Sequence, residues 1–287
     1  MSPNTAGKLL LAALAWALAL PALAESPTLA RIKRGGEIVL GYIEGAAPFS
    51  DVDSGGQPQG YSVDLCRAVA EDIGAQLGMP ALKTRWQKLT VQNRIEAVHA
   101  GRVDLECSTT TWTLTRQGAV DFSLITFVDG ANVLSLSNAG ASQLDAFAGK
   151  RIAVMSGTTT EKVLRASLAR RKVQAEVVTI ASRPEGVRLV EQAQVEGFAS
   201  DRTTLIDAIA RLPDRARFRL LDEDLSVEPY ALMLPRDDQE FRVAVNRAIA
   251  GLYRSGGIRS IYDRWLGPLG PPSLLLSASY FIQGLAE

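Results

Sequence analysis

Strand patterns and helix patterns alternate along most of this 287-residue chain. Short apolar runs rich in β-branched residues, such as EIVLGY at 37–42 and RIAVM at 151–155, are each followed by a turn and a helical pattern. A repeated strand–helix unit favours parallel sheets that are covered by helices on both faces. The alternation therefore predicts an α/β fold.

Two extended segments interrupt this alternation and divide the chain. Residues 127–133 and residues 225–230 each lie between two strand–helix regions. We interpret them as two crossings between lobes, which form a two-segment hinge. The predicted division is residues 25–128 and 229–287 for lobe 1 and residues 129–228 for lobe 2.

The first 24 residues have the pattern of a cleaved export signal. Lys8 precedes an apolar run, and Ala22-Leu23-Ala24 is an A-x-A cleavage site. The apolar run is shorter than the roughly 20 residues that span a bilayer, although an N-terminal membrane anchor is the alternative reading. We predict a signal peptide over residues 1–24 and an exported protein.

Charge and cysteine content exclude several classes of partner. The 31 basic and 31 acidic residues balance, with no basic stripe, which argues against a nucleic-acid partner. The two cysteines, Cys66 and Cys107, favour one disulfide in an oxidising compartment, with two buried free thiols as the alternative. Two cysteines and a single histidine make a poor metal-ligand set, so we expect neither a metal nor a cofactor.

A hydroxyl-rich turn after a buried strand predicts an anion site. Residues 108–111 read STTT, and Arg116 follows one helical turn later. Hydroxyl and backbone N–H donors at a helix start, together with a guanidinium, can hold a planar carboxylate. The alternative is an ordinary helix cap with a surface arginine.

The middle of the chain contains a second turn of the same kind. Residues 156–161 read SGTTTE, in which Thr158 and Glu161 fit a capping box. Asp201 comes at the carboxyl end of a later strand, which is where α/β folds place ligand groups. We expect the two polar turns to face each other.

These motifs resemble the signature region of the periplasmic amino-acid-binding proteins that serve ABC importers. The matching pieces are Asn93 and Arg94, residues 101–104, residues 109–111, Arg116, and the DFS sequence at 121–123. The QNRI and EC details are similar to the subgroup that binds glutamate and aspartate. The resemblance implies a type II two-lobe fold, a monomer, an amino-acid ligand and an ABC permease in the inner membrane.

The resemblance also implies roles for single residues. It places Arg116 and Thr111 at the α-carboxylate of the ligand and the backbone carbonyl of Thr109 at its α-amino group. Asp201 would pair with the ammonium from lobe 2. The other implied ligand-binding residues are Thr158, Thr159, Arg94 and Arg183.

Three positions depart from the acidic-amino-acid subgroup. Ile43 stands in place of an arginine, Val91 in place of a serine, and Arg183 in place of a histidine. Glutamate or aspartate remains the expected ligand. The alternative is an amino acid with a larger or less polar side chain, which Ile43, Val91 and Trp112 could admit.

An enzyme is the rival function, because the same fold also occurs in exported dehydratases of the cyclohexadienyl type. Its signal would be a carboxylate pair with separated pKa values, for which Glu44 and Asp201 are the candidates. The sequence shows no nucleophile–base pair, so we predict a binding protein and no catalytic residue.

Overall fold

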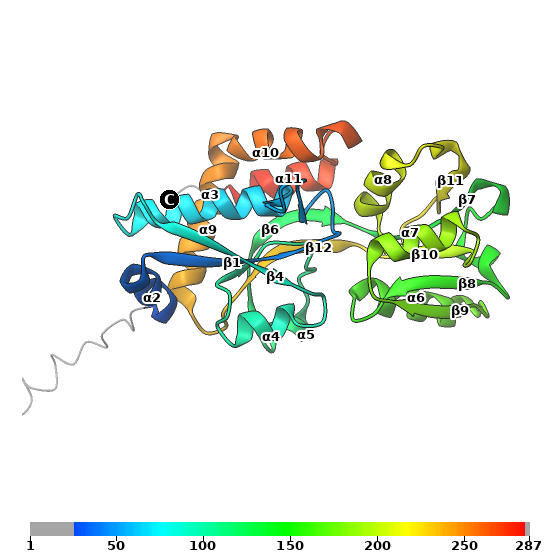
Figure 1. The fold of residues 1–287 in the computed structure, drawn as a ribbon, viewed down its shortest axis with the longest axis horizontal. Helices are drawn as coiled ribbons and strands as arrows, with labels where there is room; N and C mark the ends of the chain where they lie inside the picture. The colour runs from blue at the N-terminus through cyan, green and yellow to red at the C-terminus, as the bar shows by residue number, and fades with distance from the viewer. Residues whose placement is uncertain (1–25, 285–287) are drawn as a thin grey trace, which may run out of the picture.

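Two five-stranded sheets form the frame of the protein in a computed structural model, which describes residues 26–284 (Figure 1). The strand orders are β4-β1-β5-β12-β6 and β11-β7-β10-β8-β9. The first sheet contains β1 (Glu37–Ile43), β4 (Lys83–Leu89), β5 (Leu105–Glu106), β6 (Asp121–Asp129) and β12 (Glu228–Leu234). The second contains β7 (Ala131–Leu136), β8 (Arg151–Met155), β9 (Glu176–Ile180), β10 (Gly197–Asp201) and β11 (Phe218–Leu220). A hairpin of β2 (Asp51–Val52) and β3 (Pro58–Gln59) stands apart.

Helices surround each sheet. Around the first sheet lie α2 (Pro27–Gly35), α3 (Tyr61–Gln76), α4 (Arg94–His99), α5 (Leu114–Gln117), α9 (Gln239–Ser255), α10 (Gly257–Trp265) and α11 (Leu274–Gln283). Around the second lie α6 (Thr159–Arg171), α7 (Arg183–Glu191) and α8 (Arg202–Arg211). Short 3₁₀ segments cover Ser137–Ala139, Leu144–Phe147, Arg215–Arg217 and Gly267–Leu269. The predicted signal peptide lies outside the described residues.

Strand pairing is mixed, which corrects the expectation of purely parallel sheets. Strand β1 pairs parallel with β4 and β5, whereas β12 pairs antiparallel with β5 and β6. In the other lobe β7 pairs antiparallel with β10. Strand β6 carries the chain out of the first lobe and β12 brings it back from the second, so these two neighbouring strands run in opposite directions.

The two crossing segments pack tightly against each other. Gly130 joins β6 to β7, and a Cβ atom there would come within 2.8 Å of both Asp224 Cγ and the Ser226 carbonyl oxygen. A side chain at this position would therefore push the outgoing and returning segments apart. The lobe boundaries at 128/129 and 228/229 stay a prediction.

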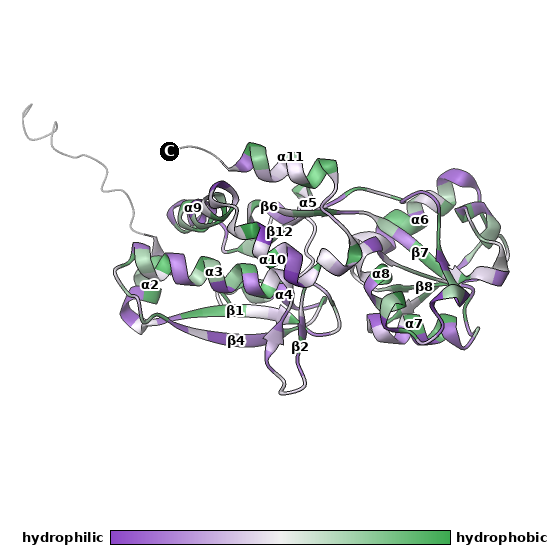
Figure 2. Cartoon of the chain, turned by 90° about the horizontal axis from the view of Figure 1, so that it is seen from above, coloured by the Kyte–Doolittle hydropathy of each residue, from purple (hydrophilic) through white to green (hydrophobic). Residues whose placement is uncertain are grey.

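Burial follows the position of each strand. Strand β1 is mostly buried and hydrophobic, while the edge strand β4 is mostly exposed and more hydrophilic (Figure 2). Phe49, which follows β1, is fully buried and packs edge-on against Tyr61, Phe127 and Tyr230, with ring centroids 4.9–6.0 Å apart. It belongs to the core of lobe 1 rather than to the mouth of a cleft.

The predicted disulfide is present. Cys66 on α3 and Cys107, directly after β5, have an S–S distance of 2.13 Å and a Cα–Cα distance of 6.1 Å. The bond fixes α3 to the strand end that leads into the hydroxyl turn. Ser62 on α3 donates from Oγ to the Ser108 carbonyl at 2.9 Å, which ties the helix to the hydroxyl turn a second time.

Candidate functional site

The hydroxyl turn of residues 108–111 lies at the end of β5 and is buried throughout. Strand β12 holds it in place from the side. The Ala231 N–H donates to the Thr110 carbonyl at 3.2 Å, and the Trp112 N–H donates to the Pro229 carbonyl at 2.7 Å. The turn is therefore fixed by the strand that returns from lobe 2.

Arg116 on α5 reaches back to this turn. Thr113 caps α5, because its Oγ1 accepts the N–H of Arg116 at 3.2 Å. The Arg116 Nη1 donates to the Thr111 carbonyl at 2.7 Å. Burial lowers the pKa of Arg116, and the negative charge of Glu106 acts in the opposite direction. A guanidinium that is held in this way can form two parallel hydrogen bonds to a carboxylate.

The N-terminus of α6 meets the same turn from lobe 2. The Thr159 hydroxyl lies 3.1 Å from the Thr111 hydroxyl. The Thr158 hydroxyl is occupied locally, since it accepts the Glu161 N–H at 3.0 Å and donates to the Met155 carbonyl at 2.8 Å. Of the two neighbouring threonines, Thr159 therefore presents its hydroxyl to lobe 1.

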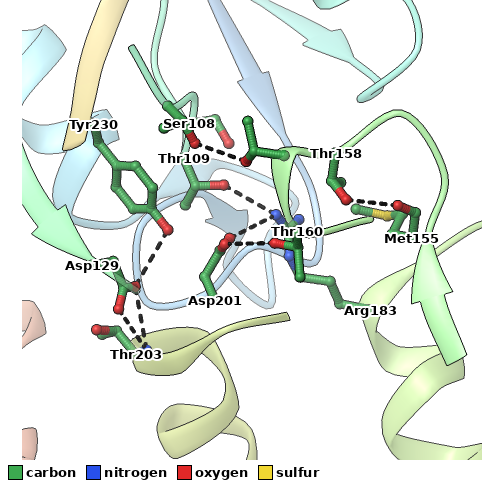
Figure 3. Close-up of polar contacts among 12 residues, drawn as sticks. Ser108, Thr109, Asp129, Met155, Thr158, Thr160, Arg183, Asp201, Thr203 and Tyr230 are labelled. Carbon is green, nitrogen blue, oxygen red and sulfur yellow. Dashed lines mark hydrogen bonds and ion pairs between the residues drawn. The ribbon is translucent and has the colours of Figure 1, made fainter. Parts of the chain in front are cut away.

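Arg183 and Asp201 form the lobe-2 wall of the site (Figure 3). Arg183 Nη2 donates to Thr109 Oγ1 across the cleft at 3.1 Å and lies 3.5 Å from Asp201 Oδ2. Thr160 Oγ1 donates to Asp201 Oδ1 at 3.2 Å. All four side chains are buried, so the two lobes are in contact here through charged and hydroxyl groups.

Two further buried groups of opposite charge, Arg94 and Glu106, lie near the hydroxyl turn. Arg94, at the start of α4, is 3% exposed, and Glu106 in β5 is fully buried. Burial lowers the pKa of Arg94 to about 10, while the Glu106 charge raises it. Burial raises the pKa of Glu106, and the charge of Arg94 lowers it. Each group thus reduces the cost of burying the other.

Asp129 and Tyr230 lie where the chain crosses between lobes. The Tyr230 hydroxyl donates to Asp129 Oδ2 at 3.3 Å, and the N–H groups of Gly130 and Thr203 also donate to this carboxylate. Burial raises the pKa of Asp129 to about 7, and the nearby charge of Asp201 adds to the effect.

The structure brings most of the expected site residues together and adds others. Thr109, Thr111, Arg116, Thr159, Arg183 and Asp201 surround the contact between the lobes, with Arg94 behind the turn. Sequence reasoning missed Thr160, Glu106, Asp129 and Tyr230. The available signal for Glu106 was an acidic residue in an otherwise apolar strand, and Asp129 likewise ends a largely apolar strand. No such signal in the sequence marked Thr160 or Tyr230.

The two carboxylates considered for catalysis are each opposed by a cation. Glu44 pairs with Lys88 on the rim of the cleft, and Asp201 pairs with Arg183. Within residues 26–284, no group of three or more His, Cys, Asp or Glu residues could hold a metal ion. The same residues include no helix that is long and apolar enough to cross a membrane.

Comparison with known proteins identifies the class. The family of bacterial extracellular solute-binding proteins, family 3, matches residues 38–268. The L-glutamate/L-aspartate-binding protein of Pseudomonas aeruginosa is 33% identical over 281 residues, covering 96% of this chain and 92% of that protein. The glutamate/aspartate import solute-binding protein of Escherichia coli K12 is 30% identical over 252 residues, covering 88% of this chain and 83% of that protein.

Solved structures show the same fold. The L-cysteine solute receptor of Neisseria gonorrhoeae superposes with a TM-score of 0.74 at 25% identity, covering 84% of this chain and 94% of that one. An ancestral arginine-binding protein superposes with a TM-score of 0.73 at 23% sequence identity, covering 81% of this chain and 99% of that one.

The fold and the polar cleft define a two-lobe binding protein of type II. The chain belongs to the bacterial extracellular solute-binding proteins, family 3. Its curated relatives named here are binding proteins, so the enzyme alternative is not favoured.

Proposed function

We propose that this protein is exported to the periplasm, captures an amino acid between its lobes and delivers it to an ABC permease in the inner membrane. One observation carries the proposal: the buried Arg116 of lobe 1 and the buried Asp201 of lobe 2 belong to polar groups that meet across one cleft. A zwitterion carries two opposite charges at a fixed separation and needs one group of each kind.

Each end of the amino acid has its own set of partners. Arg116, with the Thr111 and Thr159 hydroxyls beside it, would bind the α-carboxylate. Asp201 would bind the α-ammonium together with the backbone carbonyl of Thr109. Thr158 would contribute through its backbone, because its hydroxyl is already used in capping α6.

Lobe closure supplies the affinity and the signal. Rotation about the crossings near Gly130 and at the start of β12 would bring the two half-sites together around the ligand and exclude water. The closed monomer is then the form that the permease recognises. The relatives named for glutamate and aspartate make an acidic or related polar amino acid the first expectation.

A thermal-shift screen of the purified protein against the common amino acids tests this function. A ligand that binds only the native state at a hundredfold excess over Kd adds about 2.7 kcal/mol of stability. We expect a clear rise in Tm with at least one amino acid. No rise with any of them would contradict the proposal.

A further inference from the structure

A second compartment of the cleft extends outward from Arg183. It has a volume of about 600 Å³ and opens to solvent; it is lined from lobe 1 by residues 43–45, Asp51 and residues 88–92, and from lobe 2 by Met155 and residues 181–184. Its lining does not include Arg116, Thr111, Thr109 or Asp201. The compartment therefore lies beyond the groups that we assign to the amino-acid head and adjoins them at Arg183.

This compartment has room for more than the side chain of a free acidic amino acid. At the ~30 Å³ that each water occupies in the liquid, it holds roughly 20 waters, whereas the whole of glutamate has only about ten non-hydrogen atoms. Ile43 and Val91 line this space with apolar side chains. No long polar side chain closes the space at either position.

Polarity changes along the compartment. The inner walls include Ile43, Leu89, Val91 and Met155, each no more than 7% exposed. The outer rim carries the ion pair of Lys88 and Glu44, with side chains that are 60% and 44% exposed. These walls suit an aliphatic stem that ends in a polar or charged group near solvent.

Arg183, at the inner end, is suited to a neutral oxygen. Its charge already faces Asp201 at 3.5 Å, and its Nη2 donates to Thr109. An amide carbonyl would accept a hydrogen bond from this guanidinium without bringing in a second carboxylate to compete with Asp201.

We propose that the ligand is a γ-glutamyl peptide, in which the glutamate side chain continues through an amide into a second residue. The inference rests on the proposed function, since the glutamyl α-carboxylate and α-ammonium occupy the amino-acid site. The γ-carbonyl accepts from Arg183. The second residue lies between the apolar walls, and its carboxylate reaches Lys88.

Calorimetric titration with isomeric ligands tests this assignment. The probes are L-glutamate, L-glutamine, γ-L-glutamylglycine and α-L-glutamylglycine, of which the last has the same atoms but no free carboxylate next to the ammonium. We expect γ-L-glutamylglycine to bind at least tenfold more tightly than glutamate or glutamine, and the α-isomer to bind far more weakly. Tighter binding of glutamate than of γ-L-glutamylglycine would overturn the inference and leave the proposed function standing. Absence of binding by all four ligands and by the other amino acids would contradict both.

Two variants localise the effect. Ile43→Arg adds a cation to the inner wall and fills part of the compartment, and it should shift the affinity ratio at least tenfold toward glutamate. Because Ile43 is buried, the exposed rim supplies a second test that does not depend on the core. Lys88→Ala should lower the affinity for γ-L-glutamylglycine relative to glutamate about fivefold, whereas Lys83→Ala, on the exposed start of β4, should leave the ratio unchanged. An unchanged ratio in both Ile43→Arg and Lys88→Ala would overturn the inference.

Discussion

Asp201 and Arg183 form a buried ion pair in the lobe-2 wall of the cleft, with 3.5 Å between Oδ2 and Nη2. Their side chains are 8% and 7% exposed. Asp201 also accepts a hydrogen bond from Thr160. A ligand ammonium would therefore share a carboxylate that already has two partners, which a carboxylate with about four lone-pair sites can accommodate.

Asp201→Asn should weaken amino-acid binding by at least about a hundredfold, because it removes the countercharge of the ammonium and leaves Arg183 without its own. A ligand that lacks the amino group, such as glutarate in place of glutamate, should lose much less. Titration calorimetry with both ligands measures the difference. Asp222→Asn, at a side chain that is 65% exposed, is the matched control. Equal losses for the two ligands would exclude the assigned role.

Arg116→Lys should lower amino-acid affinity by about a hundredfold, or roughly 3 kcal/mol, since lysine keeps the charge but loses the planar fork. Arg116→Ala should abolish measurable binding. Circular dichroism should show a folded protein in both cases. Arg85→Ala removes an arginine whose side chain is 51% exposed, and binding should stay as in the wild type. Near-normal affinity of Arg116→Ala would mean that another group holds the carboxylate.

Asp129 should make stability depend on pH. Its pKa is raised from 3.8 to about 7 by burial and by the Asp201 charge, so its stabilising contribution is complete below about pH 4 and is lost as pH rises through about 7. Between about pH 5 and pH 7 this group alone should reduce the free energy of unfolding by about 2 kcal/mol. Urea denaturation of the wild type and of Asp129→Asn measures it.

The control for this pH effect is the Asp129→Asn variant itself. Its amide cannot ionise, so the stability difference between the two proteins should change by about 2 kcal/mol over that range. The Tyr230 hydroxyl and the Thr203 N–H can still donate to the amide oxygen. A difference that stays constant with pH would show that Asp129 does not titrate there.

Removing the disulfide should destabilise lobe 1. Cys66 and Cys107 are separated by 41 positions, and closing a loop of that length contributes about 4 kcal/mol in the chain-entropy model. Cys66→Ala/Cys107→Ala should therefore lower the urea midpoint markedly. Thiol labelling of the unreduced, denatured wild type should find no free cysteine. Two labelled thiols would contradict the bond.

The alternation of strands and helices sufficed to predict an α/β fold with two crossings, because hydrophobic periodicity reports local burial directly. It did not reveal that β12 and β7 run antiparallel to their neighbours, since strand direction depends on how the chain returns between lobes. Phe49 shows the same limit. Only its packing against Phe127 and Tyr230 places it in the core of lobe 1.

Sequence by itself determined the chemistry that this protein has available: a hydroxyl turn before Arg116, a second turn at the start of α6, and Asp201 at a strand end. Residue type and local spacing encode these features, because capping and strand ends are local. Tertiary structure decided which of these groups share partners. Arg183 lies 74 positions from Thr109 and still donates to it, and Asp201 is paired before any ligand arrives. Such contacts depend on how the two lobes close on each other, which no local pattern of residues encodes.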